Sequence, residues 1–536
     1  MIFATQETVR DGAQQAAERP KPRANGTIVK IKSAAFQGIE AVPIEVEVDG
    51  TRGLASLQIV GLPDKAVNEA KERVRTAIEN SGYDFPVQRL TINLAPADLR
   101  KEGASFDLPI AVGLLAVSNQ IDADVASRYA VLGELALDGR VRAVAGVLPM
   151  VFELLRRRYK GIIVPEGNAI EAGVVDGIEI YPVSHLSEVV GFLNGSYAIE
   201  PYRTDVASYF ASDKTPQVPD FSDVKGQESV KRAIVIAAAG GHNLLMVGNP
   251  GVGKSMIAQR IPGILPDLTI QEALATTKVY SIAGKLSREQ PLVTTRPFRS
   301  PHHTISDAGL VGGGTTPRPG EVSLGHNGVL FLDELPEFNR KTLEVMRQPL
   351  EDGVVTISRA TGAVTFPAQV MLVAAMNPCP CGYLGHPHRR CLDTPRQIAA
   401  YRNRISGPLL DRIDIHIEVA AVDYRQLGSN DRTTDTATMA RQVAQARAIQ
   451  QKRFAGMAVS CNARMSDRML QKFVELDAES RRLLEHAMET LSMSPRAYTR
   501  IKKLSRTIAD LAGSERVTTE HLLEAIGYRA LDRANA

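Results

Sequence analysis

Residues 248–255, Gly-Asn-Pro-Gly-Val-Gly-Lys-Ser, have the types and spacing needed to hold a phosphate group. The glycines let backbone N–H groups converge on phosphate oxygens, Lys254 adds a positive charge, and Ser255 offers a hydroxyl ligand for Mg²⁺. The pattern therefore predicts a site for ATP with its magnesium ion. The predicted nucleotide contacts are Gly248, Asn249, Pro250, Gly251, Val252, Gly253, Lys254 and Ser255.

Two adjacent carboxylates, Asp333 and Glu334, end the apolar run Gly-Val-Leu-Phe-Leu. Such a run is typical of a buried strand, and charged residues seldom end one in pairs without a function. Asp333 is predicted to hold Mg²⁺, directly or through water, and Glu334 to act as general base toward the attacking water. The predicted reaction is ATP hydrolysis.

Two further side chains are expected to complete the hydrolytic site. Asn377 ends another apolar strand pattern, and its amide is predicted to orient the attacking water from the other side of the γ-phosphate. Arg412 has no use in its own site if the strands are ordered as we infer. An arginine finger donated to a neighbouring subunit explains it, and this interpretation requires a ring of subunits.

Three of the four cysteines, Cys379, Cys381 and Cys391, lie in one short stretch. Four cysteines are too few for a disulfide framework in a chain this long, so the cluster indicates a local site. Three thiolates with one imidazole or carboxylate could bind structural Zn²⁺, whereas reduced, partly buried thiols are the alternative. Candidates for a fourth ligand are His386, His388 and Asp393.

A parallel α/β core is needed to position the ATP-binding residues. The run Asn-Leu-Leu-Met-Val predicts a buried strand directly before the phosphate loop, and the residues after Lys254 predict a helix. The strands that end at Asp333 and Asn377 are expected to lie beside it. This ATPase core is predicted to span residues 223–422.

The patterns on either side of this core differ from it. Residues 27–195 alternate between strand and helix periodicity and predict a separate α/β domain, whereas polar residues 196–222 predict a linker. Residues 423–536 have almost wholly helical periodicity and predict an all-helical lid. Residues 1–26 lack apolar periodicity and are expected to form a disordered tail.

Composition narrows the classes of protein to be considered. Hydrophobic residues make up 44% and charged residues 23% of the 536, as in ordinary globular domains. The net charge of +3 means that nucleic-acid binding would need local basic patches or an assembled surface. The sequence has neither the apolar core of a signal peptide nor a long apolar segment, so we expect a cytoplasmic protein without membrane contact.

Two insertions interrupt the predicted core. The alternation in Val-Val-Thr-Ile-Ser-Arg-Ala-Thr-Gly-Ala-Val-Thr-Phe-Pro predicts a β-hairpin that turns near Thr361 and Gly362, with Arg359 at its tip. The second insertion, residues 301–327, carries His302 and His303. In a hexameric ring both insertions could reach the central channel, where one cation from each subunit adds up to a strong positive charge. The alternative is that Arg359 is a solvated turn residue and that His302 and His303 pack structurally.

The ordered set of motifs resembles the AAA+ ATPases, and within them the magnesium-chelatase-like group. Residues 296–338 and 401–419 are so similar to the ComM/YifB family that the chain is identified as a member of it, from about residue 27 to the C-terminus. The resemblance assigns Walker A to residues 248–255, Walker B to Asp333 and Glu334, sensor 1 to Asn377, the arginine finger to Arg412 and sensor 2 to Arg496.

This resemblance implies a hexameric, ATP-driven DNA helicase or branch-migration motor that promotes integration of single-stranded DNA during natural transformation and recombination. The implied partners are single-stranded and branched DNA, further copies of the chain and a recombinase. One alternative is a magnesium-chelatase-type ATPase that drives Mg²⁺ into a porphyrin. Another is a regulator or adaptor without DNA activity, which the complete set of ATPase residues disfavours.

Residues 101–116 and 133–151 are similar to the proteolytic domain of Lon, which uses a serine–lysine dyad. Ser105 falls near the place of the nucleophile, but Leu148 stands where the lysine is expected. A serine without an adjacent base is a poor nucleophile, so this domain is predicted to lack protease activity and to serve assembly or binding. The ComM/YifB resemblance also implies a cysteine where this chain has Asp393.

Overall fold

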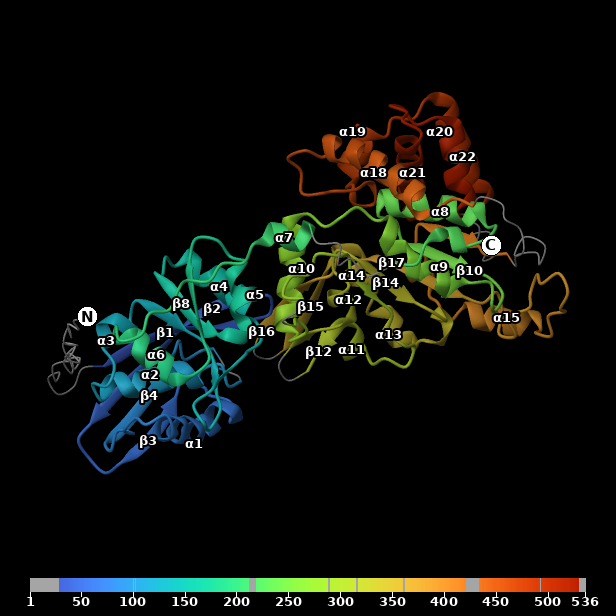
Figure 1. Cartoon of the computed structure of the whole chain (residues 1–536). Helices are drawn as coiled ribbons and strands as arrows, with labels where there is room; N and C mark the ends of the chain where they lie inside the picture. Colours follow the sequence, from blue (N-terminus) through green and yellow to red (C-terminus); the bar gives the residue numbers. More distant parts are fainter. Residues whose placement is uncertain are drawn as a thin grey trace, which may run out of the picture. The chain divides into compact units, whose positions relative to one another are not determined.

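The chain divides into two compact units in the computed structural model (Figure 1). The first consists of Met1–Val206 and Ser287–Pro291, and the second of Ala207–Leu286 and Leu292–Ala536. The structure describes residues 28–99, 101, 103–211, 218–287, 290–314, 317–359, 362–420, 433–491 and 493–529. The predicted disordered tail therefore lies outside the described residues.

The first unit is built on a seven-stranded mixed sheet with the order β3-β4-β2-β1-β5-β8-β9. Strands β1 and β2 pair antiparallel through alternately buried residues, whereas β5, β8 and β9 run parallel. The strands are β1 (Val29–Gln37), β2 (Glu40–Thr51), β3 (Ser56–Val60), β4 (Arg89–Ala95), β5 (Tyr129–Val131), β8 (Gly161–Pro165) and β9 (Glu179–Val183), with a small hairpin of β6 (Glu134–Leu135) and β7 (Val141–Arg142).

Helices pack on this sheet as the alternating sequence pattern predicts. Helix α1 begins after Asp64, whose side chain accepts a hydrogen bond from the Val67 amide, and it buries one face only. Helix α2 is buried along nearly its whole length and contacts β1 and β2. The helices are α1 (Lys65–Asn80), α2 (Asp107–Val117), α3 (Ala123–Ala126), α4 (Val147–Arg156), α5 (Ala169–Gly173) and α6 (Leu186–Leu193).

The second unit is organised around a five-stranded parallel sheet with the order β11-β14-β17-β10-β18. Every residue of β10, β14 and β17 is buried, which confirms the buried strands predicted from the apolar runs. The strands are β10 (Leu244–Val247), β11 (Phe298–Arg299), β14 (Val329–Leu332), β17 (Met371–Met376) and β18 (Ile415–Glu418).

Helices and short insertions complete this core. The predicted hairpin is confirmed as β15 (Val354–Arg359) and β16 (Gly362–Pro367), and the second insertion contains β12 (Gly312–Gly313) paired with β13 (Arg318–Pro319). The core helices are α8 (Glu228–Gly240), α9 (Lys254–Arg260), α10 (Ile270–Ile282), α11 (Asp307–Val311), α12 (Glu321–Leu324), α13 (Arg340–Glu344), α14 (Arg347–Asp352), α15 (Pro395–Arg402) and α16 (Gly407–Leu410).

The C-terminal module, residues 433–529, is helical in its described part, as its periodicity predicts. It packs on α8 through α18 and α21, and Figure 1 shows these helices in orange and red beside α8. Apolar residues of the module and of the sheet share one core cluster. The helices are α18 (Thr436–Arg453), α19 (Asp467–Phe473), α20 (Ala478–Thr490), α21 (Pro495–Leu511) and α22 (Thr519–Gly527).

The segment expected to be a linker includes a short helix and a buried anchor. It contains helix α7 (Val206–Ala211), and Phe221 near its end is fully buried. The Phe221 amide donates a hydrogen bond of 2.8 Å to Thr436 Oγ1 at the start of α18. The polar composition of the segment does not predict this anchor, because a single aromatic residue makes the buried contact.

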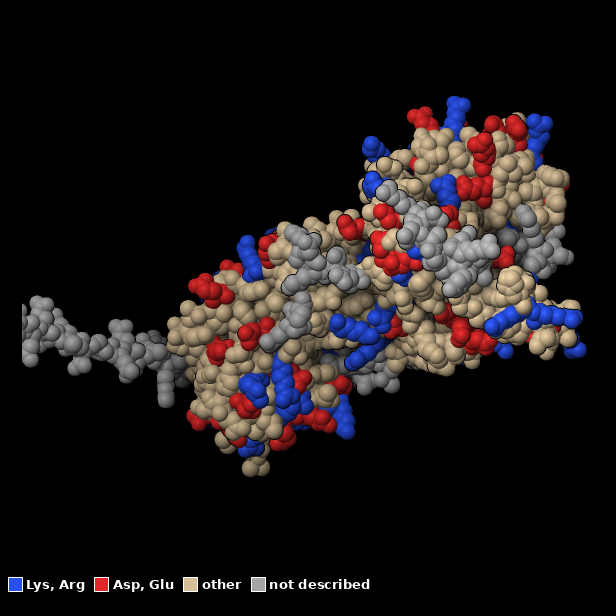
Figure 2. Space-filling view, turned by 45° about the vertical axis from the view of Figure 1, so that its right-hand side comes forward, with Lys and Arg blue, Asp and Glu red and all other residues tan. Residues whose placement is uncertain are grey.

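The described surface carries both signs of charge. Figure 2 shows lysine and arginine side chains interspersed with aspartate and glutamate over the face that is drawn. This distribution agrees with the small net charge of +3. Among the described residues, no helix is both long enough and apolar enough to cross a lipid bilayer.

Candidate nucleotide site

The phosphate loop connects β10 to α9 at the carboxyl edge of the parallel sheet. Gly253 has φ +91°, a conformation that side-chain-bearing residues adopt rarely, and α9 begins at the next residue, Lys254. The buried Lys254 ammonium donates hydrogen bonds to the carbonyls of Gly248, at 2.6 Å, and Asn249, at 3.0 Å. The loop thus holds its cation at the amino end of a helix, where phosphate binds well.

Ser255 and Asp333 meet across neighbouring elements. The Ser255 hydroxyl donates a hydrogen bond of 2.5 Å to Asp333 Oδ2. The other carboxylate oxygen of Asp333 accepts a 2.9 Å hydrogen bond from the Glu334 amide. A hydroxyl and a carboxylate are hard oxygen ligands suited to Mg²⁺, so these two residues could hold the ion.

Asn377 lies beside the same lysine. Its side-chain oxygen accepts a 3.1 Å hydrogen bond from Lys254 Nζ. Strand register explains this proximity, because Met376 at the end of β17 pairs with Val247 at the end of β10. Burial lowers the pKa of Lys254, while the charges of Asp333 and Glu334 oppose that shift. The structure therefore brings residues 248–255, 333 and 377 together.

Glu334 extends from this site with an unusual backbone. Its φ of +51° is rare for a residue with a side chain, and its side chain is 56% exposed. His303 Nδ1 lies 3.3 Å from Glu334 Oε2, and the His303 ring lies against the His302 ring, tilted by 33° with ring centres 4.1 Å apart. The insertion pattern predicts a channel position for His303, and no local pattern in the sequence links His303 to Glu334.

Arg412 is engaged within its own chain. Its guanidinium is buried and donates hydrogen bonds to the carbonyls of Arg347, at 3.0 Å, and Pro408, at 2.7 Å, and to Glu351. The described residues show no contact between Arg412 and the phosphate loop. The finger function stays a prediction, and it would require the Glu351 contact to open in a ring.

Arg496 stands near the start of α21 with an exposed side chain. Its guanidinium lies 4.0 Å from Asp411, the residue that precedes Arg412, and Ser494 Oγ donates a 3.2 Å hydrogen bond to the same carboxylate. The structure thus gathers Arg496 and Arg412 around the end of α16. Among the described residues, neither arginine contacts residues 248–255, so the sensor function of Arg496 also stays a prediction.

The cysteine loop packs directly against the phosphate loop. Asn249 Nδ2 donates a 2.5 Å hydrogen bond to the Gly382 carbonyl. A Cβ atom added at Gly382 would lie 2.6 Å from Pro250 Cγ, so the Gly382 backbone lies close to the Pro250 ring. The cysteine loop therefore borders the nucleotide site directly.

The three cysteines converge with Asp393 as a potential metal-binding group. The sulfur atoms lie 3.4 to 3.6 Å apart, and all four ligand atoms lie within 4.8 Å of one another. Tetrahedral zinc thiolates, with Zn–S bonds of about 2.3 Å, place sulfurs about 3.8 Å apart, so the donor set fits Zn²⁺. His386 instead accepts hydrogen bonds from the amides of His388 and Arg389.

The protonation of these thiols also bears on metal binding. Burial, with a smaller contribution from the neighbouring Asp393 carboxylate, raises the pKa of Cys379 to about 12. A bound cation would reverse this preference, because metal binding replaces the thiol proton. Asp393 is the fourth member of the group. It stands where the ComM/YifB resemblance implies a cysteine.

Ser105 of the first unit has an apolar residue at the position expected for its base. Leu148, at the position expected for a dyad lysine, is fully buried in α4 among apolar residues. Lys101 is buried nearby, but its ammonium donates a hydrogen bond to the Pro96 carbonyl. Within the described part of the chain, the Ser105 hydroxyl has no hydrogen-bond partner. The side chain of Arg359, at the tip of the β15–β16 hairpin, lies outside the described part.

The fold and the site define a P-loop ATPase of the magnesium-chelatase type. Residues 220–427 match the family model for magnesium chelatase subunit ChlI, residues 433–529 match the ChlI C-terminal model, and residues 46–168 match a further model for subunit ChlI of Mg-chelatase. These ranges correspond to the five-stranded core, the C-terminal module and most of the first unit.

Relatives match this chain along nearly their whole length. The chain is 44% identical to the uncharacterized protein YifB of Salmonella typhimurium over 505 residues, which cover 94% of this chain and 97% of YifB. It is also 44% identical to the competence protein ComM of Haemophilus influenzae over 506 residues, with coverage of 94% and 97%. The protein belongs to the YifB/ComM family.

A shorter match concerns Lon. Over 80 residues, 15% of this chain and 12% of the other, the chain is 38% identical to an archaeal Lon protease of Methanocaldococcus jannaschii. This agrees with the Lon-like sequence segments.

Proposed function

We propose that this protein is an ATP-hydrolysing DNA motor that works as a hexameric ring on single-stranded and branched DNA during recombination. The observation that carries the proposal is the convergence of Lys254, Ser255, Asp333 and Asn377 at one edge of the parallel sheet. A cation, a magnesium-binding pair and a water-orienting amide are the parts that phosphoryl transfer to water needs. Glu334 supplies the general base.

The placement of Arg412 and Arg496 supports a ring. Both lie around the end of α16, and neither contacts the phosphate loop of its own chain in the described structure. Catalysis of phosphoryl transfer gains strongly from an arginine at the γ-phosphate. A neighbouring subunit is the natural recipient of these side chains, and a cyclic assembly gives every subunit one such neighbour.

DNA is the proposed substrate because a relative covered along 97% of its length is named a competence protein. The β15–β16 hairpin and the 301–327 insertion are the proposed DNA-contacting elements. In a ring, one modest cation from each subunit sums to a basic channel even though the single chain is nearly neutral. Structural Zn²⁺ at Cys379, Cys381, Cys391 and Asp393 would stiffen the loop beside the nucleotide.

The test is ATP hydrolysis by the full chain with and without forked and four-way DNA, together with strand displacement on the same DNA. We expect branched DNA to stimulate hydrolysis and to be unwound only with ATP, and Lys254→Ala to abolish both activities. Glu334→Gln should retain ATP binding and lose hydrolysis. Hydrolysis that no DNA changes, with no strand displacement, would contradict the proposed motor.

The magnesium-chelatase alternative is favoured by the names of the matching family models. It predicts ATP-dependent insertion of Mg²⁺ into a porphyrin, which absorbance spectroscopy of the porphyrin detects. Running that assay on the same preparation distinguishes the two functions. Porphyrin metallation in the presence of accessory subunits, without DNA stimulation, would favour this alternative.

A further inference from the structure

A cavity of about 70 Å³ lies at the edge of the parallel sheet opposite the nucleotide site. Residues just before strands β10, β14 and β17 line it, among them Gly241, Gly328 and Val370. Because these strands are parallel, their beginnings lie on the edge away from Ser255 and Asp333, which follow strand ends. The C-terminal module closes the other side of the cavity with Arg447 and Arg464.

Three arginines and one carboxylate line this cavity, which we call the arginine pocket: Arg296, Arg447, Arg464 and Glu272. Arg296 is already fixed, with hydrogen bonds of 2.8 Å to the Asn327 carbonyl and 3.3 Å to Glu272. Glu272 is thus paired with Arg296, and neither Arg447 nor Arg464 has a carboxylate partner among the described residues. The described lining has two more positive charges than negative charges.

Arg447 and Arg464 have unused donors. Arg447 Nη2 donates a 2.9 Å hydrogen bond to the Ala238 carbonyl, but its buried Nε has no hydrogen-bond partner. Within the described part of the chain, the Arg464 guanidinium has neither a hydrogen bond nor an ion pair. Donors and charges without partners raise the free energy of the folded protein in a half-buried pocket. A bound anion would accept hydrogen bonds from these donors and balance the charge.

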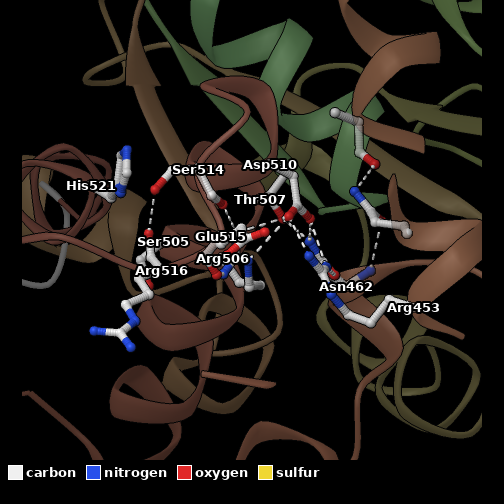
Figure 3. A network of polar contacts seen from close by, with 12 residues as sticks. Arg453, Asn462, Ser505, Arg506, Thr507, Asp510, Ser514, Glu515, Arg516 and His521 are labelled. Atoms are coloured by element: carbon white, nitrogen blue, oxygen red, sulfur yellow. Dashed lines mark hydrogen bonds and ion pairs between the residues drawn. The ribbon is translucent and has the colours of Figure 1, made fainter. Parts of the chain in front are cut away.

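The segment that carries Arg464 is fixed by buried hydrogen bonds. Arg464 ends a short 3₁₀ helix, Asn462–Arg464, and Figure 3 shows Asn462 held in a buried polar network. Asn462 donates hydrogen bonds to Asp510 at 2.8 Å and to Thr507 at 3.1 Å, and it accepts one from Arg453 at 2.9 Å. Asp510 is itself paired with Arg453, so its charge is not available to Arg464.

One side of the arginine pocket is shaped by the close packing of Gly241 against Cys461. A Cβ atom added at Gly241 would lie 2.8 Å from Cys461 Sγ and 3.5 Å from Arg447 Nη2. Gly241 therefore leaves space that a side chain would fill. A single water needs roughly 10–15 Å³, so a 70 Å³ cavity has room for a small tetrahedral anion.

Electrostatics within the pocket are consistent with unneutralised charge. Burial lowers the pKa of Arg296, and the nearby Arg447 guanidinium contributes in the same direction, against Glu272. Burial also lowers the pKa of His326 to about 4, with Arg464 adding to that shift. Burial is the largest cause of both shifts, and the neighbouring guanidinium charges act in the same direction.

We infer that the arginine pocket binds a phosphate group, with Arg447 and Arg464 as its principal donors and Arg296 as a fixed positive wall. Guanidiniums from three directions suit a tetrahedral, multiply charged anion better than a planar carboxylate. The phosphate could belong to the DNA backbone or to a small phosphate compound, since both present the same oxygens. The inference does not depend on the proposed motor activity.

The experiment is calorimetric titration of inorganic pyrophosphate into the full chain carrying Lys254→Ala, which weakens phosphate binding at the distant nucleotide site. Adding Arg464→Gln should weaken pyrophosphate binding on the order of tenfold, because one charge-assisted donor is lost. Arg468→Gln is the matched control: it removes an exposed arginine four positions along the chain that does not line the pocket. Thermal unfolding checks that both variants fold.

A second arm repeats the pyrophosphate titration with a short single-stranded oligonucleotide present. Competition would assign the site to the DNA backbone, and unchanged pyrophosphate binding would assign it to a small phosphate compound; both outcomes support a phosphate site. Equal affinities in the Arg464→Gln and Arg468→Gln proteins, or no saturable binding, would overturn the inference. Arg464→Lys, which keeps the charge, should recover part of the affinity.

Discussion

Lys254 Nζ lies 3.1 Å from the side-chain oxygen of Asn377, and this hydrogen bond joins the first residue of α9 to the residue that follows the central strand β17. The two residues are far apart in sequence, yet strand pairing between β10 and β17 fixes their separation. A nucleotide phosphate bound at the loop would therefore be surrounded by groups from several strands.

Loss of the general base should separate binding from hydrolysis. Glu334→Gln removes the acceptor for the water proton and should lower kcat by about 10²- to 10⁴-fold. ATP affinity should change little, because Lys254 and residues 248–253 remain. Turnover and equilibrium binding of a fluorescent ATP analogue measure the two quantities. A variant that hydrolyses ATP normally would remove Glu334 from the proposed mechanism.

His303 should act on hydrolysis through Glu334. Its ring lies 3.3 Å from the Glu334 carboxylate, so His303→Ala frees that side chain and should lower kcat about tenfold with little change in ATP affinity. His486→Ala, an exposed histidine in helix α20, is the control. His303→Asn, which retains a hydrogen-bond donor, should restore part of kcat. Equal rates for all three variants would contradict the positioning effect.

If Arg412 acts in a neighbouring site, two inactive variants should complement each other. Arg412→Ala and Lys254→Ala rings should each be inactive, but mixed rings contain interfaces with an intact phosphate loop on one subunit and an intact arginine on the next. Hydrolysis in the mixture should therefore exceed that of either variant alone. Glu351→Gln removes the carboxylate partner of Arg412 and should not abolish hydrolysis. Absence of complementation would argue for a local structural function of Arg412.

Zinc binding should depend on Asp393 as well as on the cysteines. We expect about one zinc ion per chain by elemental analysis, with Asp393→Ala lowering that content and Asp393→Cys retaining it. Chelation should lower the melting temperature and weaken ATP binding, because Gly382 in this loop contacts Asn249. A zinc content near zero in protein purified without chelators would sink the zinc interpretation.

Acid should destabilise the second unit partly through His326. Burial depresses its folded-state pKa from 6.5 to about 4, so the unfolded chain takes up the proton first as the pH falls. Its contribution is fully present above pH 6.5 and should decline by roughly 1.5 kcal/mol between pH 6.5 and pH 5. Melting temperatures of wild type and His326→Gln should diverge less at pH 5 than at pH 7.5; a constant difference would contradict this.

Local sequence patterns predicted much of this fold. The apolar runs before Gly248, Asp333 and Asn377 indicated buried strands, and the structure confirms all three as parallel strands of one sheet. The hairpin before β17 and the C-terminal helices were also predicted correctly. These elements are readable because burial on both faces, alternation and helical periodicity each leave a pattern in neighbouring residues.

Contacts between distant segments could not be predicted in this way. No periodicity links His303 to Glu334, Arg412 to Glu351, or Arg464 to the starts of the core strands. The order of strands in the sheet and the packing of the C-terminal module on α8 bring these residues together. Their positions depend on side-chain packing over long sequence separations, which a single sequence does not encode as a local signal.

The sequence by itself determined the phosphate-binding chemistry, because a glycine-rich loop with Lys254 and Ser255 needs only its own strand and helix to work. It also determined that Cys379, Cys381 and Cys391 form a local group. Only the tertiary structure decided that Asp393 is the fourth member, that Arg412 is paired within its own chain, and that a pocket of arginines lies opposite the nucleotide. The physical reason is that charged groups interact according to the distance between them in space. The packed sheet sets these distances, and the order of residues along the chain does not.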